Sequence, residues 1–216
     1  MNSHEREILL NELRDSDYKV RAEAKHRLRS EGWLHDGRIV GASLAGLDFS
    51  LDYSSFENAK LAFVDFSHCN LHEVQFIGSD LHGALFKNAN LRSSFWDCQA
   101  TEANFDYADC RYALLHHSFA ESSFVNCNMS YAFISGNLSG AIFINANLEG
   151  THLGDANMRG VDLSNANLLN LKLDADSIEC DETTILPDGT QWAVGTDWGR
   201  FTDSSHTIFW RSEIPE

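Results

Sequence analysis

The chain has 216 residues, an ordinary apolar content of 43% and a formal net charge of −16. Its length is sufficient for one sizeable core with capping elements. The negative charge argues against nucleic acid or an anionic membrane as a direct partner, although an acidic surface also serves plain solubility.

The first ten residues contain no apolar stretch of the length of a signal peptide or a membrane span. The five cysteines are odd in number and show no paired spacing, which favours reduced thiols. The sequence therefore predicts a cytoplasmic protein that makes no contact with a membrane.

Residues 1–41 have the spacing of two helices. The first, about ten residues long, has its apolar side chains at Ile8, Leu9 and Leu13. The second extends over about residues 17–31, with Ser16 as its candidate N-cap and Gly32 placed to end it. We expect a helical hairpin that caps the first coil of the segment that follows.

Residues 42–174 repeat every five positions. Large apolar residues stand at Phe56, Leu61, Phe66, Leu71, Phe76, Leu81, Phe86, Leu91 and Trp96, and a small or slim residue usually precedes each by two positions. A helix repeats near 3.6 residues and a half-buried strand at 2, so neither explains this period. Each unit instead directs two side chains inward and three outward, which describes a short strand followed by a corner.

The order of the aromatic residues indicates how the units stack. Phe66, Phe86, Phe105, Phe124 and Phe143 recur at intervals of 20, 19, 19 and 19. We therefore predict six to seven coils of about 20 residues, which at strand separation form a rod roughly 30 Å long. The phase loses one position after each of Trp96, Leu115 and Met129, and we expect these three losses at one edge of the rod.

The units CNLHE, SDLHG, ANLRS, ANLEG, ANMRG, VDLSN and ANLLN resemble the pattern of pentapeptide-repeat proteins: Ala, then Asp or Asn, then Leu, then two variable residues. The resemblance covers roughly residues 42–174. It implies an all-β solenoid, a right-handed quadrilateral β-helix with four units in each coil.

Residues 175–216 abandon the repeat and resemble tails that follow the repeats in other bacterial members of this family. A Pro-Asp-Gly turn at residues 187–189 precedes Trp192, Trp198 and Phe201. We expect these aromatic residues to cover the last coil. The run Ile208-Phe209-Trp210 either extends that cap or docks on another subunit.

The sequence contains no nucleotide-binding glycine loop and no zinc-ligand spacing. In the five-residue frame Cys69 points inward and its neighbours His68 and His72 point outward, so Cys69 is expected to be a packing residue. No carboxylate is fixed by the register beside His116 and His117. We therefore expect no catalytic residue, no metal site and no cofactor, and the protein is predicted not to be an enzyme.

The outward positions contain an unexpected apolar stripe formed by Phe95, Leu114 and Phe133. Tyr112, Tyr131, His116 and His117 lie near it in the same frame. An exposed aromatic patch of this kind is a candidate protein interface. The alternatives are that a cap covers the stripe, or that the register is wrong by one residue and the side chains face inward. A weaker strip comprises Leu85, Val125, Ile142 and Ile144.

Two functions agree with these features. The first is a non-catalytic scaffold that presents a flat-sided rod to another protein, as a monomer or a homodimer. The second is implied by the family resemblance: some members are acidic rods that imitate duplex DNA and bind a type II topoisomerase (gyrase), which they protect or inhibit. Mimicry of DNA requires carboxylates aligned along one face. Here the residue before each large apolar residue is more often Asn than Asp.

Overall fold

The computed structural model describes residues 3–50, 55–92, 94–173 and 177–212. The side chains of Ser3, Ser94 and Trp96 lie outside this description, and with them the inward position expected for Trp96. The elements are α1 (Ser3–Glu12), α2 (Tyr18–Ser30), β1 (Ser94–Gln99), β2 (Leu114–Ser118), β3 (Phe133–Asn137), β4 (His152–Asn157), β5 (Lys172–Leu173) and α3 (Gly199–Thr202).

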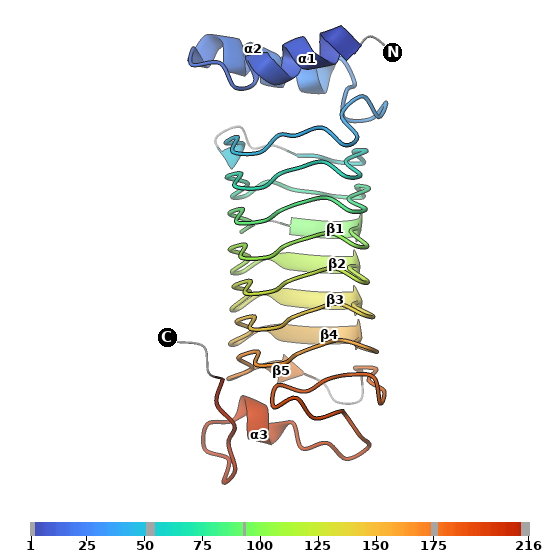
Figure 1. Ribbon diagram of the computed structural model, residues 1–216, viewed down its shortest axis with the longest axis vertical. Helices are drawn as coiled ribbons and strands as arrows, with labels where there is room; N and C mark the ends of the chain where they lie inside the picture. The colour runs from blue at the N-terminus through green and yellow to red at the C-terminus, as the bar shows by residue number, and fades with distance from the viewer. Residues whose placement is uncertain (1–2, 51–54, 93, 174–176, 213–216) are drawn as a thin grey trace.

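The chain winds into a stack of coils with α1 and α2 across one end and a cap containing α3 at the other (Figure 1). The strands β1 to β5 belong to successive coils and form one parallel sheet in that order. A second ladder of parallel bridges joins Ser43, Asp65, Leu85, Asn104, Ser123, Ile142, Asp162 and Ile185. The predicted solenoid is confirmed.

Each corner of the coil is a tight turn. The N–H three positions after a large inward residue donates to the carbonyl oxygen of that residue, as from Ala89 to Phe86 at 3.0 Å. The residue before the donor has a positive φ, which is the geometry of a type II turn. Asparagine tolerates this conformation well and occupies many of these corners: Asn58, Asn88, Asn126, Asn145, Asn165 and Asn170.

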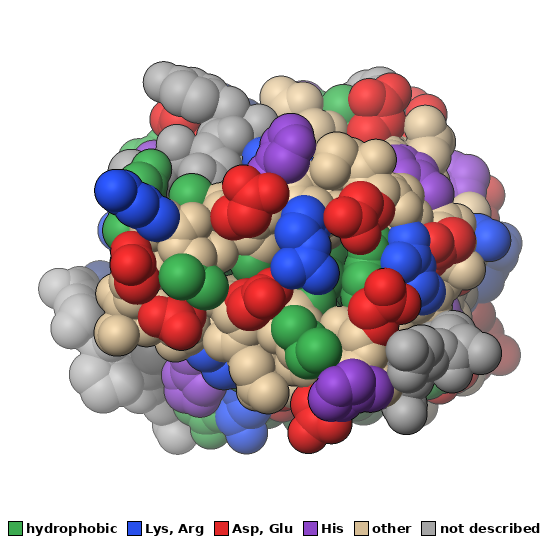
Figure 2. Space-filling view, turned by 90° about the horizontal axis from the view of Figure 1, so that it is seen from above, with side chains coloured by type: hydrophobic (Ala, Val, Ile, Leu, Met, Phe, Trp, Pro, Cys, Tyr) green, Lys and Arg blue, Asp and Glu red, His purple; other side chains and the backbone are tan. Residues whose placement is uncertain are grey.

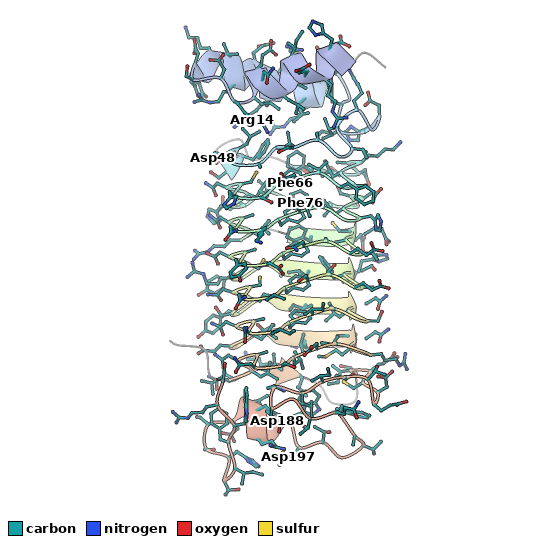
Figure 3. The ribbon with its side chains drawn as sticks, viewed as in Figure 1. Arg14, Asp48, Phe66, Phe76, Asp188 and Asp197 are labelled. Atoms are coloured by element: carbon teal, nitrogen blue, oxygen red, sulfur yellow. The ribbon has the colours of Figure 1, made fainter. Side chains whose placement is uncertain are left out.

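The predicted phenylalanine column is confirmed. Successive rings from Phe66 to Phe143 are stacked with centroids 5.2, 4.9, 4.8 and 4.8 Å apart. A second column, on the opposite side of the interior, meets it edge to face, as in the pair Phe66 and Phe76, whose centroids are 5.9 Å apart (Figure 3). The interior is thus filled mainly by aromatic and aliphatic side chains, together with a few buried hydroxyl groups such as those of Ser122 and Thr151.

Each coil has four walls. The phenylalanine face is centred on Phe66 and its column, and the asparagine face on the column that begins at Leu71. The strand face contains β1 to β5, and the fourth face is centred on the column that begins at Leu61. Along the chain, each coil follows the faces in this order and then returns to the phenylalanine face.

The prediction that Phe95 is exposed is wrong. Phe95 is fully buried, and its ring stacks on that of Phe76 at 4.9 Å with an interplanar angle of 1°. The physical reason is the place at which the five-residue phase loses a position. Leu91 and Phe95 are both buried and only four residues apart, so the loss precedes Phe95.

The prediction that the three shortened segments share one edge of the rod is wrong. Two of them lie on the strand face, where Leu115 and Phe119 and, one coil later, Ile134 and Leu138 are buried four residues apart. The loss before Phe95 lies one face earlier along the coil. The register of the sheet shifts accordingly between β1 and β2 and between β3 and β4.

The helical cap forms as predicted, with one correction. Leu9, Leu13, Ala24 and Leu28 are buried against the first coil. The N-cap of α2 is Asp17 rather than Ser16, because the Asp17 carboxylate accepts the N–H of Lys19 at 2.8 Å. Acidic and basic side chains are interspersed over the outer surface of this end (Figure 2), as expected for a terminal cap.

The tail covers the other end. Phe201 is buried, Trp192, Trp198 and Trp210 pack against the core, and the rings of Trp210 and Phe201 lie 6.0 Å apart. Trp210 therefore extends the cap, whereas Ile208 remains 63% exposed. Arg200 and Asp188 form an ion pair at 2.7 Å that ties α3 to the Pro-Asp-Gly turn.

Candidate functional site

Four outward side chains form an apolar patch where the asparagine face meets the strand face. We name the aromatic corner for these residues: Tyr112, Leu114, Tyr131 and Phe133. Tyr112, Leu114 and Tyr131 are 62%, 42% and 53% exposed, and Phe133 is half-buried. Leu114 and Phe133 are partners in the parallel register of β2 and β3. Two successive coils thus present the same pair of apolar positions, one beside the other.

The aromatic rings of the corner are held in place by the next coil. Tyr112 and Tyr131 are stacked, with centroids 5.6 Å apart and an interplanar angle of 13°. The ring of Tyr131 lies over Gly150, and the ring of Phe133 lies against Gly154 and meets His152 edge to face at 4.9 Å. The corner is therefore a rigid surface rather than a set of mobile side chains.

The backbone at this corner is strained. Tyr112 and Tyr131 have φ values of 62° and 61°, a region in which bulky residues are outliers. The cost relative to glycine is about 1–2 kcal/mol for each tyrosine. The same positive φ recurs at turns along the β-helix, as at Phe63 and Tyr107, so the fold itself imposes it.

His116 and His117 lie on the strand face beside the aromatic corner. Contrary to the expectation from the sequence, a carboxylate is fixed beside them: Asp97 of the preceding coil is 3.1 Å from Nδ1 of His116. His117 Nε2 lies 2.6 Å from the side-chain amide of Gln99. Among the described residues, no group of three or more histidine, cysteine or acidic side chains is arranged to hold a metal ion.

The second apolar strip lies on the phenylalanine face, as expected. Leu85 is 41% and Ile142 is 37% exposed, while Val125 and Ile144 are half-buried. These side chains occupy several coils and leave polar positions between them. The strip is less continuous than the aromatic corner.

A polar pocket of about 280 Å³ on the asparagine face was not predicted from the sequence. Its lining residues are His72, Asn90, Arg92, Asp109 and Arg111. Arg111 binds Asp109 through two hydrogen bonds of 2.7 and 2.6 Å, and Arg92 lies 3.6 Å from the same carboxylate. The sequence signal that could have revealed this pocket is the pair Arg92 and Arg111, at equivalent positions of successive coils. This pattern matches no catalytic or metal-binding motif.

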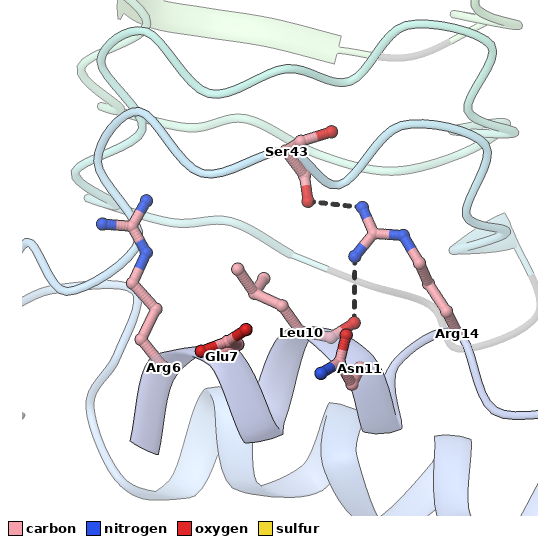
Figure 4. A pocket seen from close by; sticks show the side chains of 6 residues that line it. All are labelled: Arg6, Glu7, Leu10, Asn11, Arg14 and Ser43. Carbon is pink, nitrogen blue, oxygen red and sulfur yellow. Dashed lines mark hydrogen bonds between the residues drawn. The ribbon is translucent and has the colours of Figure 1, made fainter. Parts of the chain in front are cut away.

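A larger groove of about 420 Å³ lies between α1 and the first coil (Figure 4). Arg14 crosses it and donates hydrogen bonds to the backbone carbonyl oxygens of Leu10 and Ser43 at 2.9 and 2.6 Å. Arg6 donates to the carbonyl oxygen of Val40 at 3.2 Å. These contacts hold the helical cap against the β-helix. The groove is therefore part of the packing between the cap and the first coil.

The cysteines serve packing. Cys69 is buried, its thiol donates to the carbonyl oxygen of Leu44, and burial raises its pKa to about 12. Burial also raises the pKa of Cys98 to about 12 and that of Cys127 well above its ordinary value. Thiols with raised pKa values are poor nucleophiles. Cys110 and Cys127 are also buried, and the inward position predicted for Cys69 is confirmed.

Carboxylates are divided evenly among the four walls of the described β-helix. The phenylalanine face carries Asp65, Asp106 and Asp162; the asparagine face Asp48, Glu73, Asp109 and Glu149; the strand face Glu57, Asp97 and Asp155; and the fourth face Asp80, Glu102 and Glu121. No described face therefore presents a continuous row of acids.

Comparison with known proteins identifies the repeat. The family model described as pentapeptide repeats matches residues 54–92 and 137–174, in 8 copies. These two segments therefore consist of pentapeptide repeats. No curated protein matches the chain.

Three solved structures are similar to this chain. A trypsin-treated form of QnrB1, a plasmid-mediated fluoroquinolone resistance protein, has 21% identity and a TM-score of 0.47, covering 71% of this chain and 83% of QnrB1. HetL from the cyanobacterium Nostoc sp. strain PCC 7120 has 15% identity and a TM-score of 0.26, covering 79% and 98%. Rfr23 from the cyanobacterium Cyanothece 51142 has 24% identity and a TM-score of 0.26, covering 74% and 95%.

None of the described helices is both long enough and apolar enough to cross a bilayer.

Proposed function

We propose that the protein is a non-catalytic scaffold that binds another protein through the aromatic corner. The observation that supports this proposal is the stacked and exposed pair formed by Tyr112 and Tyr131. Tyrosine is enriched among the residues that dominate binding energy at protein interfaces. Because the next coil already fixes both rings, little side-chain entropy is lost when a partner covers them.

The size of the patch limits the kind of complex. A stable interface buries about 800 Å² on each partner, which is more than four side chains supply. A partner must therefore also cover neighbouring positions of the strand face, where His116, His117 and His152 provide a polar rim. Alternatively, the complex is transient.

The proposal is tested by quantitative affinity capture from native lysate with the double variant Leu114→Asp/Tyr131→Asp. Aspartate tolerates the positive φ at position 131, so the fold is expected to survive. The matched control is Tyr107→Asp, because Tyr107 has a φ of 60° and is 54% exposed but lies on the phenylalanine face. A partner bound by wild type and control and lost from the double variant supports the proposal. Equal recovery by all three proteins contradicts it.

Self-association is proposed for the second strip, on the phenylalanine face. The exposed aliphatic side chains of Leu85 and Ile142 are the observation in its favour. Light scattering of wild type and Ile142→Asp tests this directly: a dimer that the substitution converts to a monomer supports it, and a monomeric wild type contradicts it.

Binding to a type II topoisomerase as a DNA mimic is the second candidate function. The formal charge of −16 on a rod-shaped molecule favours it. The even distribution of carboxylates over the walls counts against it, because mimicry needs a row of charges along one face. In a supercoiling assay with purified gyrase, inhibition or drug protection by micromolar protein supports mimicry. The absence of both effects contradicts it.

A further inference from the structure

The pocket on the asparagine face concentrates positive charge on an acidic molecule. The basic residues of the β-helix are Lys60, Lys87, Arg92, Arg111, Arg159 and Lys172. Only Arg92 and Arg111 occupy equivalent positions of consecutive coils, each directly after a large inward residue. His72 occupies the same position one coil before Arg92, so the three side chains form a column along the rod.

The pocket coincides with a break in a hydrogen-bonded ladder. In this column the side-chain N–H₂ of Asn90 donates to Oδ1 of Asn70 at 3.0 Å, and further along the rod Asn167 donates to Asn147 in the same way at 3.1 Å. Asp109 stands directly after Asn90 in the column, and its side chain has no N–H to donate. Oδ1 of Asn90 is therefore left buried without a hydrogen-bond donor among the described residues.

The charges in the pocket are arranged for a ligand. Burial alone would raise the pKa of Asp109, but hydrogen bonds from Arg111 and the charges of Arg111 and Arg92 outweigh it and lower that pKa. Asp109 is therefore ionised and holds both guanidinium groups. Among the described residues, the side chain of Arg92 pairs only with this carboxylate, through Nε at 3.6 Å, so its two terminal nitrogens are available to donate.

His72 supplies a further unused polar atom. Its Nδ1 is buried in the same pocket and has no hydrogen-bond partner in the described part of the chain, while its Nε2 faces Glu73 at 3.7 Å. Leaving buried polar atoms unpaired is costly, and a bound ligand is one way of satisfying them.

We infer that this pocket binds a phosphate group. The guanidinium of Arg92 matches the oxygens of a phosphate, which it binds in a bidentate manner. Oδ1 of Asn90 is an acceptor, and it requires a ligand that also carries an O–H donor. A hydrogen phosphate ion meets both requirements, whereas a carboxylate or a sulfate offers acceptors alone.

The test is calorimetric titration of the full chain with inorganic phosphate and, separately, with sulfate. Phosphate is expected to bind with a Kd in the millimolar range and more tightly than sulfate. Arg92→Gln is expected to raise the Kd for phosphate by roughly tenfold or more, since charge-assisted hydrogen bonds are lost. The control Arg159→Gln removes an arginine that pairs with Glu179 on the fourth face, and it should leave the Kd unchanged.

Three results would overturn the inference: no heat of binding with phosphate, equal affinity for phosphate and sulfate, or equal effects of the two arginine substitutions. Circular dichroism of each variant establishes that the fold is intact. A short phosphoserine peptide and its unphosphorylated form, titrated below about pH 6 so that the phosphoester keeps an O–H, identify the source of the phosphate group. Tighter binding of the phosphopeptide than of free phosphate indicates a group carried on a polypeptide, and equal binding indicates the free ion.

This inference does not depend on the proposed scaffold function. The variant Leu114→Asp/Tyr131→Asp should bind phosphate as wild type does, because neither residue lines the pocket. Loss of phosphate binding in that variant would overturn the assignment of the site to Arg92.

Discussion

The ring of Tyr131 occupies the space in which a side chain at position 150 would begin. A Cβ on Gly150 would lie 2.6 Å from Cε1 of Tyr131, closer than non-bonded carbon atoms approach. The orientation of this exposed ring on one coil thus depends on the absence of a side chain at position 150 of the next coil. The aromatic corner is built from both coils.

Replacing Gly150 by alanine is expected to displace the Tyr131 ring and to destabilise the fold. The matched control is Gly41→Ala, because Gly41 has a φ of 65°, compared with 64° for Gly150, but has nothing within 4 Å of the added carbon. Both variants share the cost of a positive φ, so their difference isolates the clash and should be about 1 kcal/mol or more. Urea unfolding measures it. Equal midpoints for the two variants would show that the ring moves aside without cost.

Truncating Phe95 should be far more costly than truncating Leu114. Phe95→Ala removes a buried ring stacked on Phe76 and is expected to lower the free energy of unfolding by about 3–5 kcal/mol. Leu114→Ala removes a side chain that is 42% exposed and should change stability by less than about 0.5 kcal/mol. If chemical denaturation instead shows that Leu114→Ala destabilises the fold more than Phe95→Ala, the register in which Phe95 faces outward would be supported.

The cap of α2 provides a local test. Asp17→Ala removes the acceptor for the Lys19 N–H and is expected to destabilise the helical cap by about 1 kcal/mol. Ser16→Ala leaves that hydrogen bond intact and should have no such effect. Hydrogen exchange of the α2 amides reports the difference, because the cap is able to open while the β-helix stays closed. Faster exchange in the Ser16 variant alone would assign the N-cap to Ser16.

The C-terminal cap should lose stability in acid because of Asp188. Burial alone would raise its pKa, but hydrogen bonds from Thr190 and the charge and hydrogen bond of Arg200 lower it below 3.8. A lowered folded-state pKa stabilises the protein above the unfolded pKa, and this contribution disappears as the pH falls through the folded pKa. Asp188→Asn should therefore cost about 1–2 kcal/mol at pH 7 and progressively less below about pH 4.

The control for this pH dependence is Glu102→Gln, which alters an exposed carboxylate of the fourth face. As a substitution at the surface, it should change the free energy of unfolding by less than about 0.5 kcal/mol. A constant difference between wild type and Asp188→Asn from pH 7 to pH 3 would mean that the pKa of Asp188 is the same in the folded and unfolded states.

The interior was predictable because burial dictates the repeat. A five-residue unit with two inward positions permits only one winding, so Phe66 to Phe143 could be placed in one column from the sequence alone. Phe95 and Trp96 were ambiguous for the same reason: both are large and apolar, and either satisfies the local pattern. Only the four-residue spacing between the buried residues Leu91 and Phe95 decides between them.

The outer walls were less predictable because polar positions tolerate many residues. The exposure of Tyr112 and Tyr131 followed from the frame, but their stacking and their support by Gly150 depend on contacts between coils. The role of Asp109 was hidden because aspartate and asparagine are interchangeable in the repeat pattern. The difference matters here because Asp109 leaves the side-chain oxygen of the neighbouring Asn90 without a hydrogen-bond donor.

The two dissimilar ends of the molecule have a consequence for its assembly. An open ladder of parallel strands would allow further copies to add at either end and grow into a fibre. Here α1 and α2 cover the first coil and the tryptophan-containing tail packs at the last. End-to-end polymerisation is thereby blocked, so the molecule has a defined length and can be approached only from its sides.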